Sequence, residues 1–371
     1  MAENSVSKNL ETFHIKLTAL SPVHVGSGNM IEKQDIYFYP ERNEVTVFNM
    51  ERLFSILADR RLADDYERYV LGGKHKSLRE FFYSCRLSPD DVKPAVLYTV
   101  SSKGVFDREP LLTAIHQFVR LPDCRPYIPG SALKGALRTV LLNHLIKEGS
   151  YSRDEITKQG RYGISAFTAD KIENALLNKL NYKDADRGSG SIKSVMRGIS
   201  VSDSEPIENG NIILAQKFDS TGKVTNNKLN LVRECVRPGT TFRFSVSVDK
   251  SVYLEAGIEF DSASLQKYIR ENFEYYQNTF LSHFDNGYST LPENSHNCIY
   301  LGGGAGFFSK TFVYKALGFE KGLSFVSEYL TAVFKGKNEK DLIYGISPHM
   351  LKCTRYNGKL VQFGLCKVEM E

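Results

Sequence analysis

The chain has 371 residues, of which 42% are hydrophobic and 25% charged, so it has the composition of a folded globular protein and room for two domains. Its net charge is only +5, so a surface that binds anions has to be a local patch. The sequence has no apolar run of membrane-spanning length, no signal-peptide core and no closely spaced cysteine pair, which predicts a cytoplasmic protein with reduced cysteines and no metal or other cofactor.

Residues 1–148 are predicted to form a first α+β unit. Apolar and polar side chains alternate over residues 12–20, which predicts a half-buried strand, and a Gly/Ser-rich loop follows over residues 21–28. Asn49 is a natural cap for a helix that begins beside it. The other elements predicted in this unit are a hairpin over residues 36–48, peripheral helices over residues 61–84, strands over residues 96–100 and 115–121, and a helix from Ser131 to Lys147.

Residues 149–198 are predicted to be an insertion, and residues 199–371 a second unit. The insertion is rich in Lys and Arg, contains a helix around residues 169–180, and carries a Gly/Ser-rich hexapeptide at residues 186–191 that is typical of a mobile loop. The second unit contains predicted strands over residues 199–203, 212–215, 229–232, 242–246 and 360–368, and a long helix over residues 262–283. Two units of strands with one or two helices each predict an α+β fold of two ferredoxin-like (RRM-like) modules with helical and basic-loop insertions.

The helix that begins at Ser131 has an unusual first turn. Pro129-Gly130 predicts a turn, and Ser131 has the side chain of an N-cap. Lys134 stands where a capping box has Glu or Gln, and Arg138 follows one turn later, although the positive end of a helix favours carboxylates. An external phosphate bound to the first-turn N–H groups and flanked by the two cations explains this pattern. Two solvated cations on an exposed face are the alternative.

A glycine-rich loop, Gly302-Gly303-Gly304-Ala305-Gly306, is a second candidate anion site. Glycines allow backbone N–H groups to converge on an anion, and Lys310 follows closely. The spacing matches neither a P-loop nor a dinucleotide-binding fingerprint. A tight turn packed against a sheet is the alternative, and the nearby Phe307 and Phe308 are candidates for base stacking or for the core.

Catalytic constellations are weak in this sequence. His24 in the first loop has the chemistry of a general base toward a ribose 2′-OH, but the sequence identifies neither a second acid–base group nor a cation to go with it. Asp203 and Glu205 are better explained as polar residues at a strand end than as metal ligands. No Ser/His/Asp or Cys/His set is evident, so the sequence predicts a protein that is not an enzyme.

Several stretches resemble the RAMP superfamily of CRISPR-associated proteins. They are residues 21–28 (SPVHVGSG), 127–138 (YIPGSALKGALR), 302–307 (GGGAGF), and the closing residues 346–352 (ISPHMLK) with 364–366 (GLC). Their order and the chain length resemble one family within it, the fifth subunit of the Csm complex in type III-A CRISPR systems. The resemblance covers nearly the whole chain, although Ala305 interrupts the glycines relative to the typical pattern.

The resemblance implies a non-catalytic RNA-binding subunit that caps the 3′ end of crRNA and supports crRNA maturation and complex assembly. The implied partners are crRNA, the other Csm subunits, above all the adjacent backbone RAMP subunit, and trimming nucleases; no membrane is implied. Carried over to this sequence, the RNA-binding candidates are His24, Ser27, Ser131, Lys134, Arg138, Gly302, Gly303, Gly304, Gly306 and Lys310. The basic insertion adds an RNA-clamping loop with Lys183, Arg187, Lys193 and Arg197, for which a merely solvated loop is the alternative.

Two other functions stay open from the sequence. One is a RAMP-type, metal-independent endoribonuclease that processes precursor crRNA with His24 as its base. The other is an enzyme that uses the two anion sites for a small phosphorylated ligand. RNA cleavage in EDTA that is lost in His24→Ala would support the first, and stabilisation by nucleotides rather than by RNA would support the second.

Overall fold

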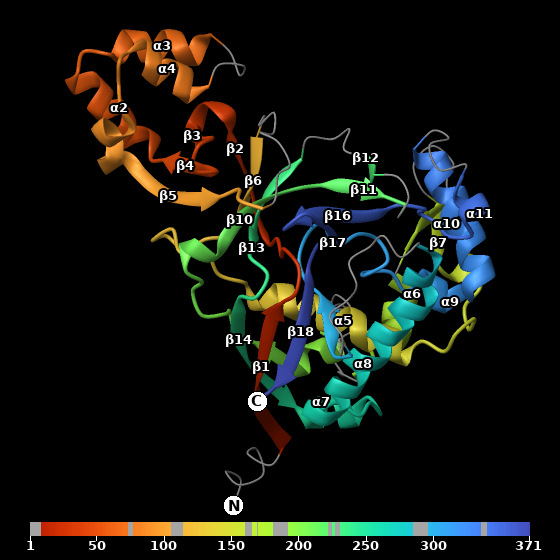
Figure 1. Cartoon of the computed structure of the whole chain (residues 1–371). Coiled ribbons are helices and arrows are strands. Elements are labelled where there is room, and N and C mark those ends of the chain that lie inside the picture. The colour runs from red at the N-terminus through yellow and green to blue at the C-terminus, as the bar shows by residue number, and fades with distance from the viewer. Residues whose placement is uncertain are drawn as a thin grey trace, which may run out of the picture.

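A computed structural model describes residues 9–72, 77–104, 114–159, 165–168, 170–180, 192–221, 225–226, 231–284, 296–334 and 340–371. Within these residues the chain is a mixed α+β protein with several sheets, which confirms the predicted class (Figure 1). Lys183, Arg187 and the predicted loop at residues 186–191 lie outside the described residues.

The first large sheet has five strands in the order β15-β18-β1-β14-β9. The alternation predicted for its central strand is confirmed, because Ile15 and Leu17 are buried whereas His14 is exposed. This central strand pairs antiparallel with both of its neighbours. The strands are β1 (Leu10–Ala19), β9 (Ile199–Val201), β14 (Thr241–Asp249), β15 (Cys298–Tyr300) and β18 (Leu365–Met370).

The second large sheet has seven strands in the order β2-β6-β13-β10-β5-β4-β3. These strands are β2 (Gly26–Glu32), β3 (Ile36–Tyr39), β4 (Glu44–Phe48), β5 (Val96–Ser101), β6 (Ala114–Phe118), β10 (Ile212–Gln216) and β13 (Val232–Val236). Both large sheets combine strands from residues 1–148 with strands from residues 199–371. The two ends of the chain therefore share sheets, and the division into ferredoxin-like modules stays a prediction.

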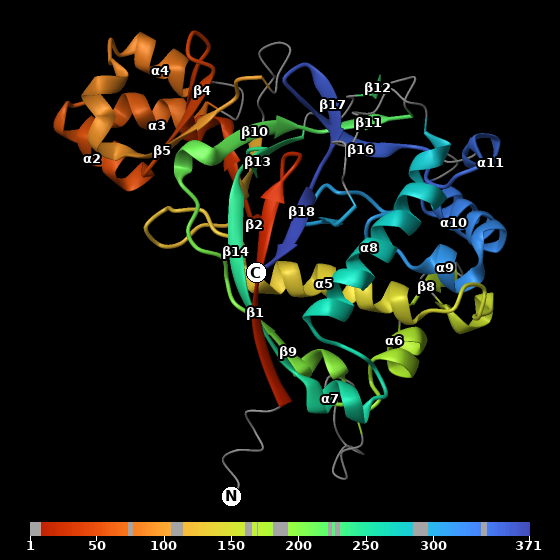
Figure 2. The same ribbon diagram turned by 60° about the horizontal axis from the view of Figure 1, so that its bottom comes forward.

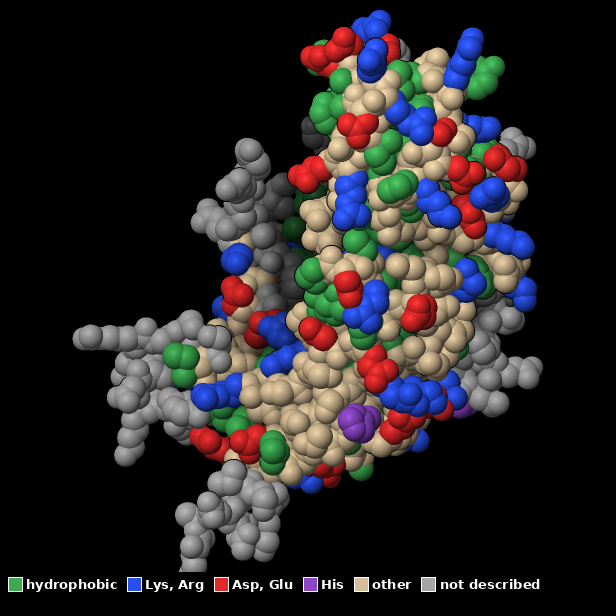
Figure 3. Space-filling model, turned by 90° about the vertical axis from the view of Figure 1, so that its left-hand side faces the viewer, with side chains coloured by type: hydrophobic (Ala, Val, Ile, Leu, Met, Phe, Trp, Pro, Cys, Tyr) green, Lys and Arg blue, Asp and Glu red, His purple; other side chains and the backbone are tan. Residues whose placement is uncertain are grey.

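Three helices form a lobe with its own small core at the upper left of Figure 1. They are α2 (Met50–Asp59), α3 (Ala63–Leu71) and α4 (Leu78–Ser84). Asn49 caps α2 as predicted, because its side chain accepts a hydrogen bond from the Arg52 N–H at 3.0 Å. On the face in Figure 3, which includes this helical lobe, basic and acidic side chains are interspersed, as the small net charge implies.

Two long helices pack on each other beside the five-stranded sheet (Figure 2). They are α5 (Gly130–Leu145) and α8 (Ser262–Thr279), which match the helices predicted over residues 131–147 and 262–283. Leu133, Leu137 and Leu141 give α5 its buried side. The remaining helices are α6 (Asp170–Leu176), α7 (Lys250–Glu255), α9 (Val313–Leu317), α10 (Phe319–Val333) and α11 (Asp341–Tyr344).

A small four-stranded sheet corrects the sequence prediction near the C-terminal end. The single strand predicted over residues 360–368 is wrong, because the chain turns at Gly364, whose φ is +84°. The prediction also missed three strands of this sheet, in residues 218–220, 225–226 and 351–356. The strands of this sheet are β11 (Phe218–Ser220), β12 (Thr225–Asn226), β16 (Leu351–Tyr356) and β17 (Lys359–Gln362), and a separate hairpin consists of β7 (Thr157–Gln159) and β8 (Ser165–Phe167).

Candidate nucleic-acid interface

Three loops that lie far apart in the sequence are joined by backbone hydrogen bonds. The Gly303 N–H donates to the His24 carbonyl at 2.7 Å, and the Leu301 N–H donates to the Gly364 carbonyl at 2.7 Å. The Gly364 N–H donates in turn to the Pro22 carbonyl at 2.9 Å. The sequence motifs around residues 24, 303 and 364 are therefore packed together in one part of the fold.

The glycine-rich loop owes part of its composition to this packing. Gly302 has a φ of +81°, and a Cβ there would lie 2.1 Å from the His24 carbonyl oxygen, so only glycine fits. Ala305, the residue that interrupts the glycines, is buried. Gly304 and Gly306, by contrast, line an open cavity. The loop is thus both a packed turn and a cavity wall.

The cavity beside this loop, here called the basic cavity, has a volume of about 500 Å³. Four cationic side chains line it together with Phe307, which is 37% exposed. The cations come from the loop after β10, from β13, from the chain that follows the glycine-rich loop, and from β16: Lys217, Arg233, Lys310 and Lys352. Like charges gathered in a concave site create a local positive potential that attracts anions.

The positive charge of the basic cavity is only partly neutralised within the fold. Asp219 accepts from Lys352 at 2.8 Å and lies 3.3 Å from the Lys217 ammonium. Burial lowers the pKa of Lys217 and of Lys310, and also lowers the pKa of Arg233, whose Nη1 is buried without a hydrogen-bond partner in the described structure. Desolvated cations without full compensation are costly, and a bound phosphate would supply the missing acceptors.

A second cavity of about 320 Å³ adjoins the first and is here called the α5–α8 cavity. Three residues predicted as RNA contacts, from two separate motifs, line it together: Ser131, Gly302 and Lys310. Lys310 and Thr311 line both cavities. The structure thus brings the start of α5 and the glycine-rich loop to one place, with Lys310 between the two spaces.

The first turn of α5 differs from the predicted anion site. The cap position is taken by Pro129 rather than Ser131, and the Gly130 N–H donates to Asp203 Oδ1 at 2.8 Å. The carboxylate that the dipole of α5 calls for is therefore supplied by a distant part of the chain. Lys134 and Arg138 also have protein partners, the Ile199 carbonyl and the Glu173 carboxylate.

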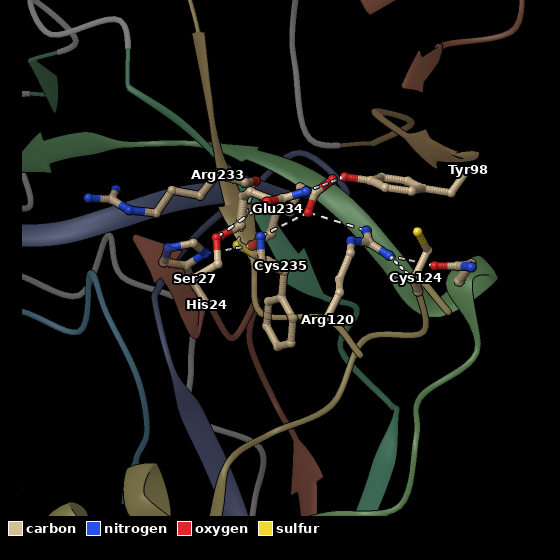
Figure 4. A network of polar contacts seen from close by, with 11 residues as sticks. His24, Ser27, Tyr98, Arg120, Cys124, Arg233, Glu234 and Cys235 are labelled. Carbon is tan, nitrogen blue, oxygen red and sulfur yellow. Dashed lines mark hydrogen bonds and ion pairs between the residues drawn. The ribbon is translucent and has the colours of Figure 1, made fainter. Parts of the chain in front are cut away.

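His24 is buried at the edge of the seven-stranded sheet (Figure 4). Its Nδ1 lies 2.7 Å from the backbone carbonyl of Glu234, and since a carbonyl only accepts, this nitrogen carries the proton. Burial, with a smaller contribution from the nearby positive charge of Arg233, lowers the pKa of His24 to about 4. His24 is therefore a neutral imidazole at neutral pH whose ring is committed to the fold.

The carboxylate of Glu234 is fully buried in the same network. Its Oε2 accepts from the Phe118 N–H at 2.8 Å and from Arg120 Nη2 at 3.2 Å. The Arg120 guanidinium lies 3.6 Å from the centre of the Tyr98 ring. Burial raises the pKa of Glu234, while Arg120 and the Phe118 N–H oppose that rise. The network connects β5, β6 and β13, so its role is to stabilise the sheet.

The remaining candidates lie away from both cavities. Ser27 is exposed at the start of β2, where its hydroxyl donates to the Gln117 carbonyl at 3.4 Å. Arg197 is exposed and donates to the Ile192 carbonyl at 3.3 Å, whereas Lys193 is half-buried. None of the three lines either cavity, so their RNA contacts stay a prediction.

Sequence reasoning missed three of the four cations of the basic cavity: Lys217, Arg233 and Lys352. Lys352 belongs to a stretch that carried the family resemblance, but no role was predicted for it. The signal in the sequence was the alternation of Leu351 and Cys353, both buried, with Lys352, which indicates a strand that has one polar side.

The described residues were compared with the requirements of a metal site and of a membrane span. No group of three or more His, Cys, Asp or Glu side chains in the described part of the chain is arranged to hold a metal ion. None of the described helices combines the length and apolar character needed to cross a bilayer. The two cavities are lined by cationic, amide, hydroxyl and aromatic side chains.

Comparison with known proteins assigns the chain to a class. The family model of the RAMP superfamily matches residues 16–309, and the chain belongs to that superfamily. Within it, the chain is similar to the CRISPR system Cms protein Csm5 of Streptococcus thermophilus, with 27% identity over 323 residues that cover 84% of this chain and 83% of the relative. The Csm5 protein of Mycobacterium tuberculosis (strain ATCC 25618 / H37Rv) is 26% identical over 383 residues, which cover 97% of this chain and 98% of the relative.

Solved structures share the fold. A chain in the cryo-EM structure of a Csm–crRNA–target RNA ternary complex of a type III-A CRISPR–Cas system superposes with a TM-score of 0.64 at 20% identity, covering 96% of this chain and 100% of that chain. The crystal structure of T. onnurineus Csm5 superposes with a TM-score of 0.60 at 21% identity, covering 95% and 99%. The whole described architecture is thus that of Csm5 proteins.

Proposed function

We propose that this chain is the Csm5-type subunit of a type III-A CRISPR effector complex and that it binds crRNA as the cap on its 3′ end. The observation that carries the proposal is the basic cavity, where four cations and the exposed Phe307 meet the glycine-rich loop. Single-stranded RNA is held by cations along its phosphates and by aromatic rings on its bases, and this cavity offers both. The match to a chain in a Csm–crRNA complex supports the same function.

The subunit acts by binding and assembly rather than by cleaving RNA. A metal-independent ribonuclease needs a base that can reach a ribose 2′-OH, whereas His24 is 5% exposed and its Nδ1 proton is held by a backbone carbonyl. Its pKa, lowered by burial to about 4, also makes the ring a weak base. These features favour a structural role for His24 over the endoribonuclease alternative.

The proposed partners follow from the type of complex. They are the other Csm subunits, first the adjacent backbone RAMP subunit, and nucleases that trim the 3′ end during crRNA maturation, all in the cytoplasm. We further propose that the two large sheets represent two RRM-like modules, each completed by strands from both ends of the chain. Binding along a module surface is how such folds hold single-stranded RNA.

Co-purification tests the proposal. The chain is expressed with the other Csm subunits and a CRISPR array, purified through a tag on the chain, and the retained RNA is sequenced. We expect crRNA and the other subunits to be recovered, and the Lys217→Gln/Lys352→Gln variant to retain less RNA or RNA with altered 3′ ends. Lys267→Gln, which removes one positive charge at an exposed site on α8, is the control and should behave as wild type.

Recovery of the chain alone, without RNA or subunits, would contradict the proposal. It would favour the alternative of an enzyme that binds a small phosphorylated ligand. Cleavage of RNA in EDTA by the purified chain, lost in His24→Ala, would contradict the non-catalytic part alone. A cation variant that retains wild-type RNA would show that the RNA lies elsewhere on the subunit.

A further inference from the structure

The α5–α8 cavity has the size and position of a nucleotide site. Its volume of about 320 Å³ is at the lower end of the range for small-molecule pockets. It opens beside the basic cavity, with which it shares Lys310 and Thr311. Single-stranded RNA whose phosphates lie in the basic cavity thus has a second, more enclosed space directly beside it.

One side of the α5–α8 cavity is lined by small side chains and the other by aromatic rings, which leaves room for a flat ligand between them. On the α5 side it is lined by small residues one turn apart, Ser131, Gly135 and Thr139. Aromatic rings, among them Tyr300 and Phe308, line it from the chain that surrounds the glycine-rich loop. Base–aromatic stacking contributes to RNA binding for every base, because every base has a π-face.

A buried polar atom without a hydrogen-bond partner among the described residues also lines this cavity. Asn143 is 4% exposed and donates through Nδ2 to Asn272 Oδ1 at 2.9 Å, which leaves its own Oδ1 buried without a hydrogen bond in the described structure. Buried polar groups are usually paired, and the edge of a nucleobase carries the matching donors and acceptors.

Lys310 marks the boundary between the two cavities. Within the described residues its ammonium makes no ion pair or hydrogen bond, although the surrounding protein lowers its pKa by desolvation. A phosphate bound to Lys310 would lie between the RNA sugar–phosphate backbone in the basic cavity and a nucleobase in the α5–α8 cavity. Within the described residues, the cation at Lys310 and the unsatisfied amide oxygen of Asn143 thus match the phosphate and the base of one nucleotide.

We propose that the α5–α8 cavity takes one unstacked nucleobase of single-stranded RNA, with the phosphate of that nucleotide on Lys310. The proposal rests on the proposed function and adds to it a contact that depends on one base rather than on the backbone alone. A free mononucleotide offers the same chemistry, so the test has to separate the two sources.

The test uses fluorescently labelled U8 and A8 oligoribonucleotides and matched oligomers in which one nucleotide at a time is abasic. For at least one of the two sequences, we expect wild-type protein to lose roughly tenfold in affinity at one abasic position, as loss of one base stack implies. Gly135→Leu fills the cavity from α5, where a Cβ meets nothing within 4 Å, and should bind the intact oligomer as wild type binds the abasic one. Gly135→Ala is the matched control and should bind as wild type does.

The outcomes separate this proposal from the function on which it rests. Equal wild-type affinity for intact and abasic oligomers of both sequences, while Lys217→Gln/Lys352→Gln weakens all of them, would overturn the base pocket and leave RNA binding in place. Absence of binding to every oligomer at low salt would overturn both. UMP or AMP competing as well as the octamers would assign the cavity to a free nucleotide and overturn the RNA contact.

Discussion

His24 is buried as a neutral ring whose Nδ1 proton lies on a backbone carbonyl, so the residue couples folding to pH. Its pKa is lowered from 6.5 to about 4, which means that the unfolded chain binds a proton at this position between those two pH values and the folded chain does not. Stability from this group is therefore fully present above about pH 6.5 and is lost as the pH falls through 4.

Replacing His24 by Gln removes this linkage while keeping a hydrogen-bond donor. We expect the free energy of unfolding of wild type to fall by roughly 3 kcal/mol more than that of His24→Gln between pH 7 and pH 4, since one pKa unit corresponds to about 1.4 kcal/mol. Urea unfolding at a series of pH values measures this difference. Parallel curves for the two proteins would show that His24 is not the linked group.

Loss of the buried ion pair between Arg120 and Glu234 through a single substitution is expected to lower the free energy of unfolding strongly. Arg120→Met leaves the fully buried carboxylate without its cation, and we expect a loss of roughly 3–5 kcal/mol. Arg120→Met/Glu234→Gln should lose less, because the amide oxygen still accepts from the Phe118 N–H.

The exposed pair between Arg125 and Asp123 is the matched control for that measurement. Its loss in Arg125→Gln should change the unfolding free energy by less than about 1 kcal/mol, because water screens exposed charges. A double variant of the buried pair that is no more stable than Arg120→Met would contradict the assignment of the effect to an orphaned charge.

At the scale of elements, α5 is fixed by segments that lie far away in the sequence. The Gly130 N–H is capped by Asp203, and the Lys134 ammonium donates to the Ile199 carbonyl at 2.7 Å. Arg138 forms an ion pair with Glu173 of α6. The cations that suggested an external phosphate thus have partners inside the fold, and β9 with its following loop holds the helix at its start.

Two glycines of α5 predict opposite responses to the same substitution. A Cβ on Gly130 would lie 2.2 Å from the Val201 carbonyl oxygen, so Gly130→Ala forces backbone apart and should cost roughly 2 kcal/mol or more. A Cβ on Gly135 meets nothing within 4 Å, so Gly135→Ala should stabilise the protein by roughly 0.5–1 kcal/mol through helix propensity. Thermal unfolding measures both, and equal shifts would contradict the close contact at Gly130.

How much the sequence predicted depends on how local each feature is. The strand around Ile15 and the cap at Asn49 depend on neighbours within a few residues, and both were predicted correctly. The partners of Lys134 and Gly130 lie more than 60 residues away, at Ile199 and Asp203, and no periodicity encodes them. Arg233 and the other missed cations meet only because distant strands pair, so the basic cavity could not be found from spacing.

At the scale of the whole molecule, the net charge of only +5 means that RNA binding depends on the local charge of the basic cavity. The salt dependence of RNA binding should therefore depend on the cations of that cavity. Each phosphate released from a cation reduces the slope of log K against log salt by roughly 0.7 for a single strand. Lys217→Gln/Lys352→Gln should therefore weaken binding of U8 and flatten its slope by roughly 1.4. An unchanged slope, measured by anisotropy at several salt concentrations beside Lys267→Gln, would place the phosphates elsewhere.

The position of β1 in the five-stranded sheet also has a consequence for biosynthesis. Ile15 faces Met370 across the pairing of β1 with β18, a separation of 370 − 15 = 355 residues. Contacts this distant slow folding, since a long loop must close before they form. While the ribosome is still translating the middle of the message, one side of β1 has no strand to pair with. The nascent chain therefore carries an open β-edge, a site for chaperones or for aggregation, until the codons for β18 have been read.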